Sequence, residues 1–322
     1  MTLLTSRRRL LAGAALLASP ALIRRARAAS GLRMGDQRGN VQAVMQAAGV
    51  LNDLPYEITW SEFAAAAPLI EAVNAGAVDG GNVGDAPFTF GFAAGVKMKA
   101  IAVSRSSQQG TAILVKDDSP AHAFSDLAGK RVATGRGSVG HFLVLMALRR
   151  AKLDVSAIQL TFLQPADAKA ALLSGSVDAW STWEPYTSQL ELLNHGRQVV
   201  NGVGLTPGLG YQIATDAAIA EKRPMLEDFV ARMTRARKWA ATHPEEYAVF
   251  WAKLMNFPES IPRQWFGRTR VEIVPADEAV FRDEQGVIDV YAGAGMLART
   301  FEARSAIDAG FNAAVARGNG VA

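Results

Sequence analysis

The sequence of 322 residues contains no cysteine. This absence excludes disulfide bonds, catalysis by a thiolate and metal sites built on cysteine. It also excludes a lipid-anchored start, because such an anchor needs a cysteine at the cleavage point. Histidine is scarce as well, and the four residues, His122, His141, His195 and His243, lack the spacing of metal ligands. We therefore expect neither a bound metal nor a cofactor.

Acidic residues are missing from the first 28 positions, which carry six arginines. Without those six charges the formal net charge changes from +4 to −2. The remaining chain is therefore mildly acidic, and it lacks the clustered positive charge of a protein that binds nucleic acid. We expect no nucleic-acid partner.

A hydrophobic run long enough to span a membrane is also missing. The apolar stretch at 10–23 is too short and too rich in alanine and glycine to cross a bilayer. It follows S-R-R-R-L-L at 6–11 and precedes A-R-A at 26–28, a pattern typical of a cleaved export signal. Residues 1–28 resemble a twin-arginine signal, with a general secretory signal or a basic tail as the alternatives. We expect an exported protein, retained without an anchor in the periplasm.

Strand and helix patterns alternate twice along the rest of the chain. With 322 residues, of which 49% are hydrophobic, two lobes are expected rather than one core. A first β-α-β-α-β-α-β-β series is predicted at 32–35, 40–51, 56–60, 65–75, 78–83, 88–94, 99–103 and 111–116. A second series is predicted at 131–134, 142–151, 158–162, 165–174, 177–181, 184–193, 199–201 and 211–215. Helices are predicted at 225–242, 244–255, 261–267 and 277–304, with a frayed tail from Ala316. The alternation predicts an α/β fold with open, mainly parallel sheets.

An internal repeat supports the division into two lobes. The sequence A-V-N-A-G-A-V-D at 72–79 matches A-L-L-S-G-S-V-D at 171–178, and another acid, Asp85 or Glu184, follows six residues after each copy. Chance similarity between two β-α-β units is the alternative. If the repeat is real, the carboxyl ends of the strands of both lobes face a common cleft, which is where open α/β sheets bind ligands.

The sequence G-R-G-S-V-G-H at 135–141 joins a predicted strand to a predicted helix. Glycines at such a junction leave backbone N–H groups free at the helix N-terminus, where an anion can bind. We expect Ser138 to cap the helix and the N–H groups of Ser138, Val139, Gly140 and His141 to face an oxyanion. The spacing also fits the G-x-G-x-x-G motif of dinucleotide sites, but the next strand, 158–162, ends without the carboxylate that would hold a ribose. A glycine-rich turn that binds nothing is the other alternative.

The positions of two tryptophans and the lack of a catalytic triad help to distinguish a binding protein from an enzyme. Trp183 lies at the end of a predicted strand and can form an apolar wall for an organic ligand, whereas Trp180 lies inside the strand and is expected in the core. Ser138 lacks the G-x-S-x-G motif of a nucleophile elbow, because Arg136 stands at the first glycine position. These features favour a binding protein over an enzyme.

Five blocks then carry a resemblance: 33–39, 84–87, 137–141, 165–168 and 177–186. Together they resemble the periplasmic solute-binding proteins of ABC importers for aliphatic sulfonates, with taurine and nitrate binders as close relatives. The resemblance implies a two-lobed type II periplasmic binding protein fold, in which two Rossmann-like open sheets are joined by two crossovers. We place the crossovers near 115–118 and 213–216, so that lobe 1 contains 29–115 plus 217–322 and lobe 2 contains 116–216.

The resemblance also implies where the ligand binds. The sulfonate group would meet Gln37, the amides around 138–140, and His141. The rest of the site would be lined by Asp85, Trp183, Glu184 and Tyr211. The complete predicted set is Gln37, Arg38, Gly84, Asp85, Ser106, Gly137, Ser138, Val139, Gly140, His141, Trp183, Glu184 and Tyr211.

Three departures from the family pattern affect the ligand. Asp36 stands where an aromatic residue is frequent, Val139 and Gly140 replace serines, and Glu184 replaces the commoner aspartate. Carboxylates near the cleft could repel an anion or could hold the ammonium of an amino-sulfonate.

The implied function is capture of a small organic anion, with an alkanesulfonate first, and delivery to an ABC permease in the inner membrane by a monomeric protein. Taurine, nitrate or another small anion is the alternative within this class. An enzyme of related fold that makes a pyrimidine or menaquinone precursor is the alternative of another class. The missing cysteines count against the first of these enzymes, and an export signal counts against both.

Overall fold

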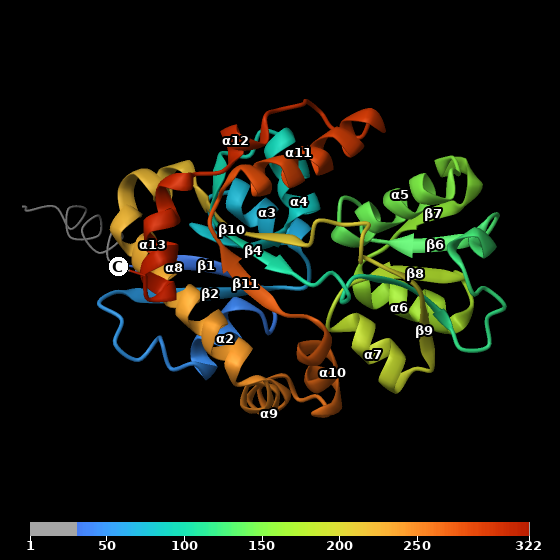
Figure 1. The fold of residues 1–322 in the computed structure, drawn as a ribbon, viewed down its shortest axis with the longest axis horizontal. Coiled ribbons are helices and arrows are strands. Elements are labelled where there is room, and N and C mark those ends of the chain that lie inside the picture. The colour runs from blue at the N-terminus through green and yellow to red at the C-terminus, as the bar shows by residue number, and fades with distance from the viewer. Residues whose placement is uncertain (1–30, 322) are drawn as a thin grey trace, which may run out of the picture. The chain divides into compact units, whose positions relative to one another are not determined.

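Two mixed β-sheets organise residues 31–321, the part of the chain that the computed structural model describes (Figure 1). The six-stranded sheet has the order β11 (Val271–Val274), β4 (Met98–Ser106), β10 (Leu209–Thr215), β3 (Gly80–Gly84), β1 (Gly31–Gln37) and β2 (Glu57–Phe63). The five-stranded sheet has the order β7 (Gln159–Phe162), β6 (Arg131–Thr134), β8 (Ala179–Thr182), β5 (Ala112–Lys116) and β9 (Gly196–Asn201). The predicted export signal lies outside the described residues.

Strand directions confirm the predicted α/β class. In the larger sheet β1 pairs in parallel with β2 and β3, while β10 runs antiparallel between β3 and β4, and β11 is antiparallel to β4. In the smaller sheet β6 pairs in parallel with β7 and β8, and β5 runs antiparallel to β8 and β9. The predicted mainly parallel pairing is therefore wrong: two of the five strand pairings in the larger sheet and two of the four in the smaller sheet are parallel, because β10, β11 and β5 run against their neighbours.

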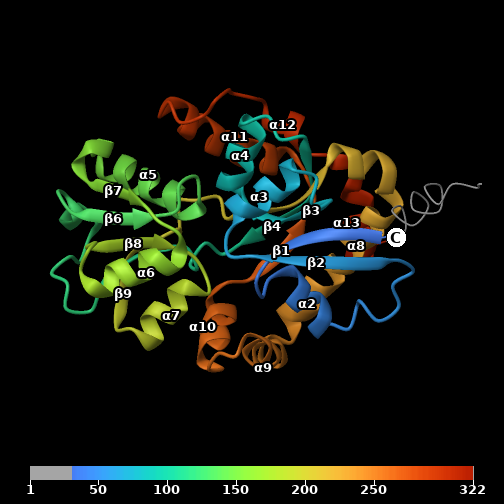
Figure 2. The same ribbon diagram turned by 180° about the vertical axis from the view of Figure 1, so that it is seen from behind.

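Helices pack on both faces of each sheet, as seen from opposite sides in Figures 1 and 2. Lobe 1, built on the six-stranded sheet, contains α2 (Val41–Ala47), α3 (Ala66–Asn74), α4 (Asp85–Ala93), α8 (Asp216–Thr242), α9 (Pro244–Met255), α10 (Ser260–Arg268), α11 (Glu278–Gly293), α12 (Ala303–Ala306) and α13 (Asn312–Asn319). Lobe 2, built on the five-stranded sheet, contains α5 (Val139–Ala151), α6 (Pro165–Ser174) and α7 (Tyr186–Leu193). Single turns of 3₁₀ helix occur at Phe124–Leu127, Val155–Ala157 and Ala309–Phe311.

The chain passes between the two sheets in the segments 107–111 and 202–208. Both crossings lie earlier than the predicted 115–118 and 213–216. The reason is the pairing of the adjacent strands, because β5 bonds to β8 and β9 whereas β10 bonds to β3 and β4. The predicted limits, 29–115 plus 217–322 and 116–216, are therefore corrected: β5 belongs to lobe 2 and β10 to lobe 1.

The C-terminal third differs most from the sequence prediction. The single helix expected at 277–304 is wrong, because α11 ends at Gly293 and a turn follows, in which Gly295 has a φ of +65°. The tail expected to fray instead forms α13, which buries Val315 against α8. Helix α8 begins earlier than expected, at Asp216, and it is kinked near Pro224, which has no N–H to donate.

The internal repeat corresponds to the same hydrogen-bonded unit in each lobe. In lobe 1, Arg33 Nη2 donates to Asp79 Oδ1 at 2.6 Å, and Nη1 donates to the carbonyl of the glycine that follows α3 at 2.8 Å. In lobe 2, Arg131 Nη2 donates to Asp178 Oδ1 at 3.0 Å and to the carbonyl of the glycine that follows α6 at 2.8 Å. In each lobe the arginine thus links the end of a helix to the start of the next strand by hydrogen bonds. The two lobes share this local structure.

Candidate ligand-binding site

A cavity of about 1090 Å³ lies between the lobes. Its walls come from the segments at the carboxyl ends of the parallel strands of both sheets, as the repeat predicted. Gln37, Gly84, Ser106 and Phe162 are the last residues of β1, β3, β4 and β7, and Gly135 and Trp183 directly follow β6 and β8.

Most of the predicted ligand residues line this cavity. Those that do are Gln37, Arg38, Gly84, Asp85, Ser106, Gly137, Ser138, Val139, Trp183 and Glu184. Gly140, His141 and Tyr211 do not, although the resemblance implied them. These three residues are buried and pack beneath the residues that line the cavity.

Tyr211 is fully buried in the core of lobe 1. Its hydroxyl donates to Glu284 Oε2 at 2.9 Å, and its ring centroid lies 4.6 Å from that of Phe88 in α4. Side chains alternate along a strand, so Tyr211 faces the helix layer while Gly210 beside it reaches the cavity. The prediction that Tyr211 contacts the ligand is therefore wrong.

His141 lies beneath the loop that precedes α5 and is 1% exposed. Its Nδ1 accepts a hydrogen bond from the Gly137 N–H at 3.1 Å, which assigns the proton of the neutral ring to Nε2. Burial, with a smaller effect of Arg136, lowers the pKa of His141 to about 4, so the ring is neutral at physiological pH. The structure corrects its predicted place in the ligand shell: His141 holds the loop.

Gly140 is required for packing. The Ser181 hydroxyl of β8 donates to the Gly140 carbonyl at 2.7 Å, and a Cβ on Gly140 would lie 2.7 Å from the Ser181 carbonyl oxygen. A side chain at this position would push α5 away from the sheet. The close approach of helix and strand explains this glycine better than a ligand does.

The N-terminus of α5 offers fewer donors than predicted. Ser138 caps the helix as expected, since its Oγ accepts from the His141 N–H at 3.1 Å. The Ser138 N–H donates to the Gly135 carbonyl at 3.1 Å, so it is occupied as well. Among residues 31–321 no acceptor is found for the N–H groups of Val139 and Gly140. Of these two residues Val139 lines the cavity and Gly140 does not, so the Val139 N–H, the Ser138 hydroxyl and the dipole of the 13-residue helix α5 form the anion cradle.

Arg136 adds a positive charge beside the cradle. Its side chain is exposed, and its Cζ lies 4.0 Å from the ring centroid of Phe162, which also lines the cavity. In the part of the chain that the structure describes, no carboxylate oxygen lies within 4.0 Å of this guanidinium. The ring positions the guanidinium without neutralising it.

Asp85 and Glu184 occupy equivalent places in the two lobes, each near the start of a helix. Asp85 Oδ1 accepts from the Ala86 N–H at 2.7 Å, and burial raises the pKa of Asp85 to about 6. Burial also raises the pKa of Glu184, although Arg268 and Ser188 oppose the shift. Because Glu184 is paired with Arg268, it is not available to an ammonium group in the cavity.

The bridge from Arg268 to Glu184 connects the lobes and was missed by sequence reasoning. Arg268, at the end of α10 in lobe 1, donates to Glu184 Oε1 at 2.7 Å, to Glu191 Oε2 at 2.7 Å and to Ser188 Oγ at 2.9 Å. The three acceptors belong to lobe 2, and Arg268 is only 16% exposed. Residues so distant in sequence share no local pattern that could have predicted the contact.

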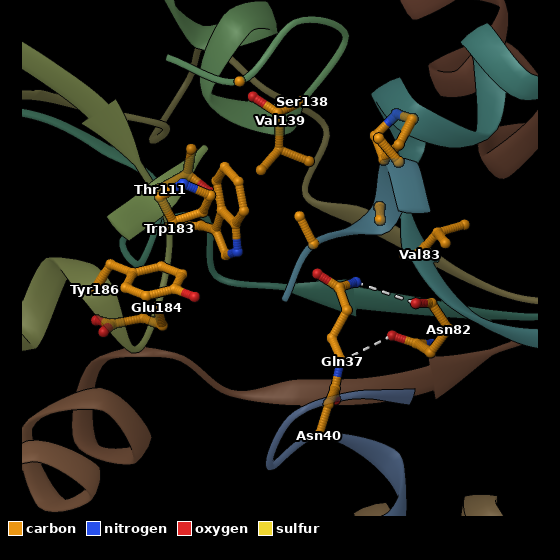
Figure 3. A pocket seen from close by; sticks show the side chains of 18 of the residues that line it. Gln37, Asn40, Asn82, Val83, Thr111, Ser138, Val139, Trp183, Glu184 and Tyr186 are labelled. Carbon is orange, nitrogen blue, oxygen red and sulfur yellow. Dashed lines mark hydrogen bonds between the residues drawn. The ribbon is translucent and has the colours of Figure 1, made fainter. Parts of the chain in front are cut away.

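Aromatic and amide side chains form the walls that face each other across the cavity. Figure 3 shows Trp183 and Tyr186 on one side and Gln37 with Asn82 on another. The rings of Trp183 and Tyr186 meet edge to face at 6.0 Å, and Trp183 follows β8 as predicted. Trp180, within β8, is 1% exposed and confirms its predicted place in the core.

Metal clusters and membrane-spanning helices are both absent from the described residues. Within 31–321, no three histidine, aspartate or glutamate side chains converge on a point where they could hold a metal ion. In that same range none of the helices combines the length and the apolar character needed to cross a membrane.

Comparison with known proteins identifies the family. The profile of the NMT1-like family matches residues 38–256. The chain belongs to the NMT1-like family. A relative from Escherichia coli (strain K12), named for aliphatic sulfonate binding, is 32% identical over 81% of this chain and 83% of its own length.

Two solved structures share the fold of this NMT1-like protein. The periplasmic aliphatic sulphonate binding protein SsuA from Escherichia coli is 29% identical, with a TM-score of 0.78 over 87% of this chain and 92% of that one. The alkanesulfonate-binding protein SsuA from Xanthomonas axonopodis pv. citri, bound to MOPS, is 28% identical, with a TM-score of 0.81 over 87% and 98%. The two-lobed fold of periplasmic binding proteins is thereby confirmed.

The lobes of this NMT1-like protein meet closely at Gly84 and Val139. A Cβ on Gly84 would lie 2.5 Å from Cγ1 of Val139 in the other lobe, while the Gly84 backbone (φ −75°, ψ 171°) suits any residue. We expect Gly84→Ala to cost about 1–3 kcal/mol of lobe closure through overpacking, which weakens ligand binding by about tenfold to 100-fold in calorimetry.

Val139→Ala provides the compensating change. It removes the methyl that the new Cβ would meet, so the Gly84→Ala/Val139→Ala double variant should regain most of the affinity lost in Gly84→Ala. Equal affinities for Gly84→Ala and the wild type would contradict the view that the lobes close to this distance around the ligand.

Proposed function

We propose that this chain is the exported solute-binding component of an ABC importer and captures aliphatic sulfonates in the cavity between its lobes. The observation that carries the proposal is the anion cradle, where the unbonded Val139 N–H, the Ser138 hydroxyl and Arg136 line a space with aromatic walls. A sulfonate has three acceptor oxygens and one negative charge on an organic tail, which matches both parts of this cavity.

The free energies of the polar contacts indicate that the organic tail of the ligand also contributes to affinity. Each charge-assisted hydrogen bond is worth about 1.5–3 kcal/mol, and the helix dipole adds about 0.3–1 kcal/mol. Micromolar binding needs about 8 kcal/mol net of the costs of association. Burial of an organic tail against Trp183 and Phe162 supplies the difference, at roughly 25 cal/mol per Å² of apolar surface.

The size and the charged residues of the cavity make nitrate and taurine less suitable ligands than alkanesulfonates. A nitrate ion would leave most of the 1090 Å³ unfilled and most of the apolar wall unused. Taurine carries an ammonium group, for which Glu184 is unavailable because Arg268 holds it. Larger alkanesulfonates therefore suit the cavity better than either.

The proposal also includes the export of the protein, its location and its delivery of the ligand to a permease. The twin-arginine pattern at 6–11 supports export, and the relatives whose structures are known are described as periplasmic or alkanesulfonate-binding. We infer a monomer in the periplasm that delivers its ligand to a permease of the inner membrane. The relative from Escherichia coli (strain K12) that matches 81% of this chain is named as a binding protein, which favours transport over catalysis.

Calorimetry of the mature protein tests the proposed ligand class. The panel contains alkanesulfonates of increasing chain length, MOPS, taurine, nitrate and sulfate. We expect one site per chain, with a dissociation constant of about 1 μM for the longer alkanesulfonates. Nitrate and sulfate should bind at least about 100-fold more weakly. Failure of every sulfonate to bind at millimolar concentration would overturn the assignment.

A further inference from the structure

Arg237 of α8 lines the cavity without a carboxylate partner. Its Nη2 donates to the side-chain oxygen of Asn40, a neutral group, and its side chain is half-buried. Across residues 31–321 no carboxylate oxygen lies within 4.0 Å of its guanidinium. The positive charge therefore remains available to a group inside the cavity.

The other arginines of lobe 1 that are at least partly buried within residues 31–321 are all paired with carboxylates. Arg105, Arg223 and Arg232 each place a guanidinium nitrogen 2.7 Å from a carboxylate oxygen. Asp36 is the acid whose pKa responds to Arg237, but both its oxygens accept hydrogen bonds from the first N–H groups of α2, at 3.1 and 2.9 Å. Asp36 is thus committed to the helix.

The groups around Arg237 form a cluster of amides that is held in place. Gln37 Nε2 donates to the Asn82 carbonyl at 3.1 Å, and Asn40 Nδ2 donates to Asn82 Oδ1 at 3.0 Å. All three side chains line the cavity, and Figure 3 shows their mutual hydrogen bonds. A preorganised amide cluster beside an unpaired guanidinium is suited to bind an acceptor group of a ligand.

This amide cluster lies away from the anion cradle. Ser138 and Val139 occupy one side of the cavity in Figure 3 and Asn40, with Gln37, the opposite side, and Trp183 lies between the two sides. The two sites belong to different lobes, since Asn40 in the turn before α2 and Arg237 in α8 lie in lobe 1, whereas the anion cradle lies at the start of α5 in lobe 2. A ligand whose sulfonate sits in the cradle therefore extends towards Asn40 and Arg237 as it crosses the cavity.

We propose that Arg237, with Asn40 and Gln37, recognises a second acidic group, and that the preferred ligands are sulfonates with a carboxylate or a second sulfonate at the far end of the chain. The inference rests on the proposed function, because it takes one sulfonate to be bound at the cradle. Each negative group then meets its own positive site, Arg136 with the helix dipole at one end and Arg237 at the other. A ligand with an uncharged end leaves Arg237 uncompensated.

Matched ligand pairs test the inference by calorimetry. Butane-1-sulfonate is compared with 4-sulfobutanoate, and hexane-1-sulfonate with 6-sulfohexanoate, at a pH where the carboxylate is ionised. We expect at least one sulfocarboxylate to bind about tenfold or more tightly than the alkanesulfonate of the same length. If both sulfocarboxylates bind as weakly as their partners or more weakly, the inference is wrong while the proposed function stands.

Arg237→Gln and the control Arg235→Gln attribute the preference to the residue. Arg235 lies on the same helix, is exposed and does not line the cavity. Arg237→Gln should abolish the preference for the sulfocarboxylate and leave alkanesulfonate affinity within about twofold, whereas Arg235→Gln should preserve both. Equal weakening of both ligands by Arg237→Gln would mean a structural role and would overturn the inference. If no sulfonate of either kind binds the wild type, the proposed function and this inference fail together.

Discussion

Gly137→Val is expected to abolish sulfonate binding, with a loss of at least about 100-fold, while the protein stays folded. Gly137 has a φ of +65°, which a β-branched residue adopts at a cost of about 1–3 kcal/mol. Its Cβ would lie 3.0 Å from the ring of Phe90 in the other lobe, so the side chain would also oppose closure of the cavity. The Val139 N–H would no longer be aimed at the anion.

Gly129→Val separates backbone strain from loss of the site. Gly129 also lies in lobe 2 and has a φ of +74°, and a Cβ at this position would meet open space within 4 Å. The variant should lose similar stability in thermal unfolding but keep full affinity. Normal binding by Gly137→Val would show that the ligand sits elsewhere. Gly140→Val is a poorer probe, because its side chain would meet the Ser181 backbone and disturb the packing of α5.

Arg268→Met is expected to weaken both folding and binding. Removal of the guanidinium leaves Glu184 buried without its counter-ion, which costs about 3 kcal/mol in unfolding free energy. It also removes the principal ion-pair bridge between α10 and α7, so the closed arrangement is less populated and affinity falls by about tenfold. Urea unfolding and calorimetry measure the two effects.

The loss of stability in Arg268→Met should depend on pH. The pKa of Glu184 is already raised by burial, and without Arg268 it rises further. A carboxyl whose pKa is raised on folding stabilises the folded state below its unfolded pKa, and that contribution is lost as the pH rises through the folded pKa. The deficit should therefore grow as the pH rises and Glu184 loses its proton in the folded state, and shrink as the pH falls.

Two further variants complete this test. Glu184→Gln in the Arg268→Met background removes the unpaired charge and should restore part of the stability and abolish the pH dependence. Arg263→Met, on the same helix, breaks only exposed pairs with Glu245 and Glu259 and should change stability by less than about 1 kcal/mol. A pH-independent loss in Arg268→Met would contradict the role assigned to Glu184.

Local patterns predicted the elements near the cavity well. Helix α6 begins at Pro165 and α9 at Pro244 as expected, because proline is favoured in the first turn of a helix. Ser138 caps α5 since its side chain needs only the N–H three residues ahead. Interactions between residues close in sequence determine such features, so the sequence displays them directly.

Contacts between distant residues could not be predicted in this way. Nothing near β5 or β10 shows which sheet each strand joins, because either edge offers the same backbone donors and acceptors, and both crossings were therefore misplaced. The same holds for Tyr211, whose orientation depends on the core that Glu284 and Phe88 complete.

By itself, then, the sequence determined the α/β class, the doubled unit at 72–79 and 171–178, and the glycine-rich turn at the start of α5. Each of these depends on a periodic pattern or on neighbours in the chain. Tertiary structure alone decided that only the N–H groups of Val139 and Gly140 remain free, that Arg268 joins the lobes, and that Arg237 lacks a counter-ion among residues 31–321. The physical reason is that hydrogen-bond satisfaction and charge pairing depend on which groups folding brings within about 4 Å of each other.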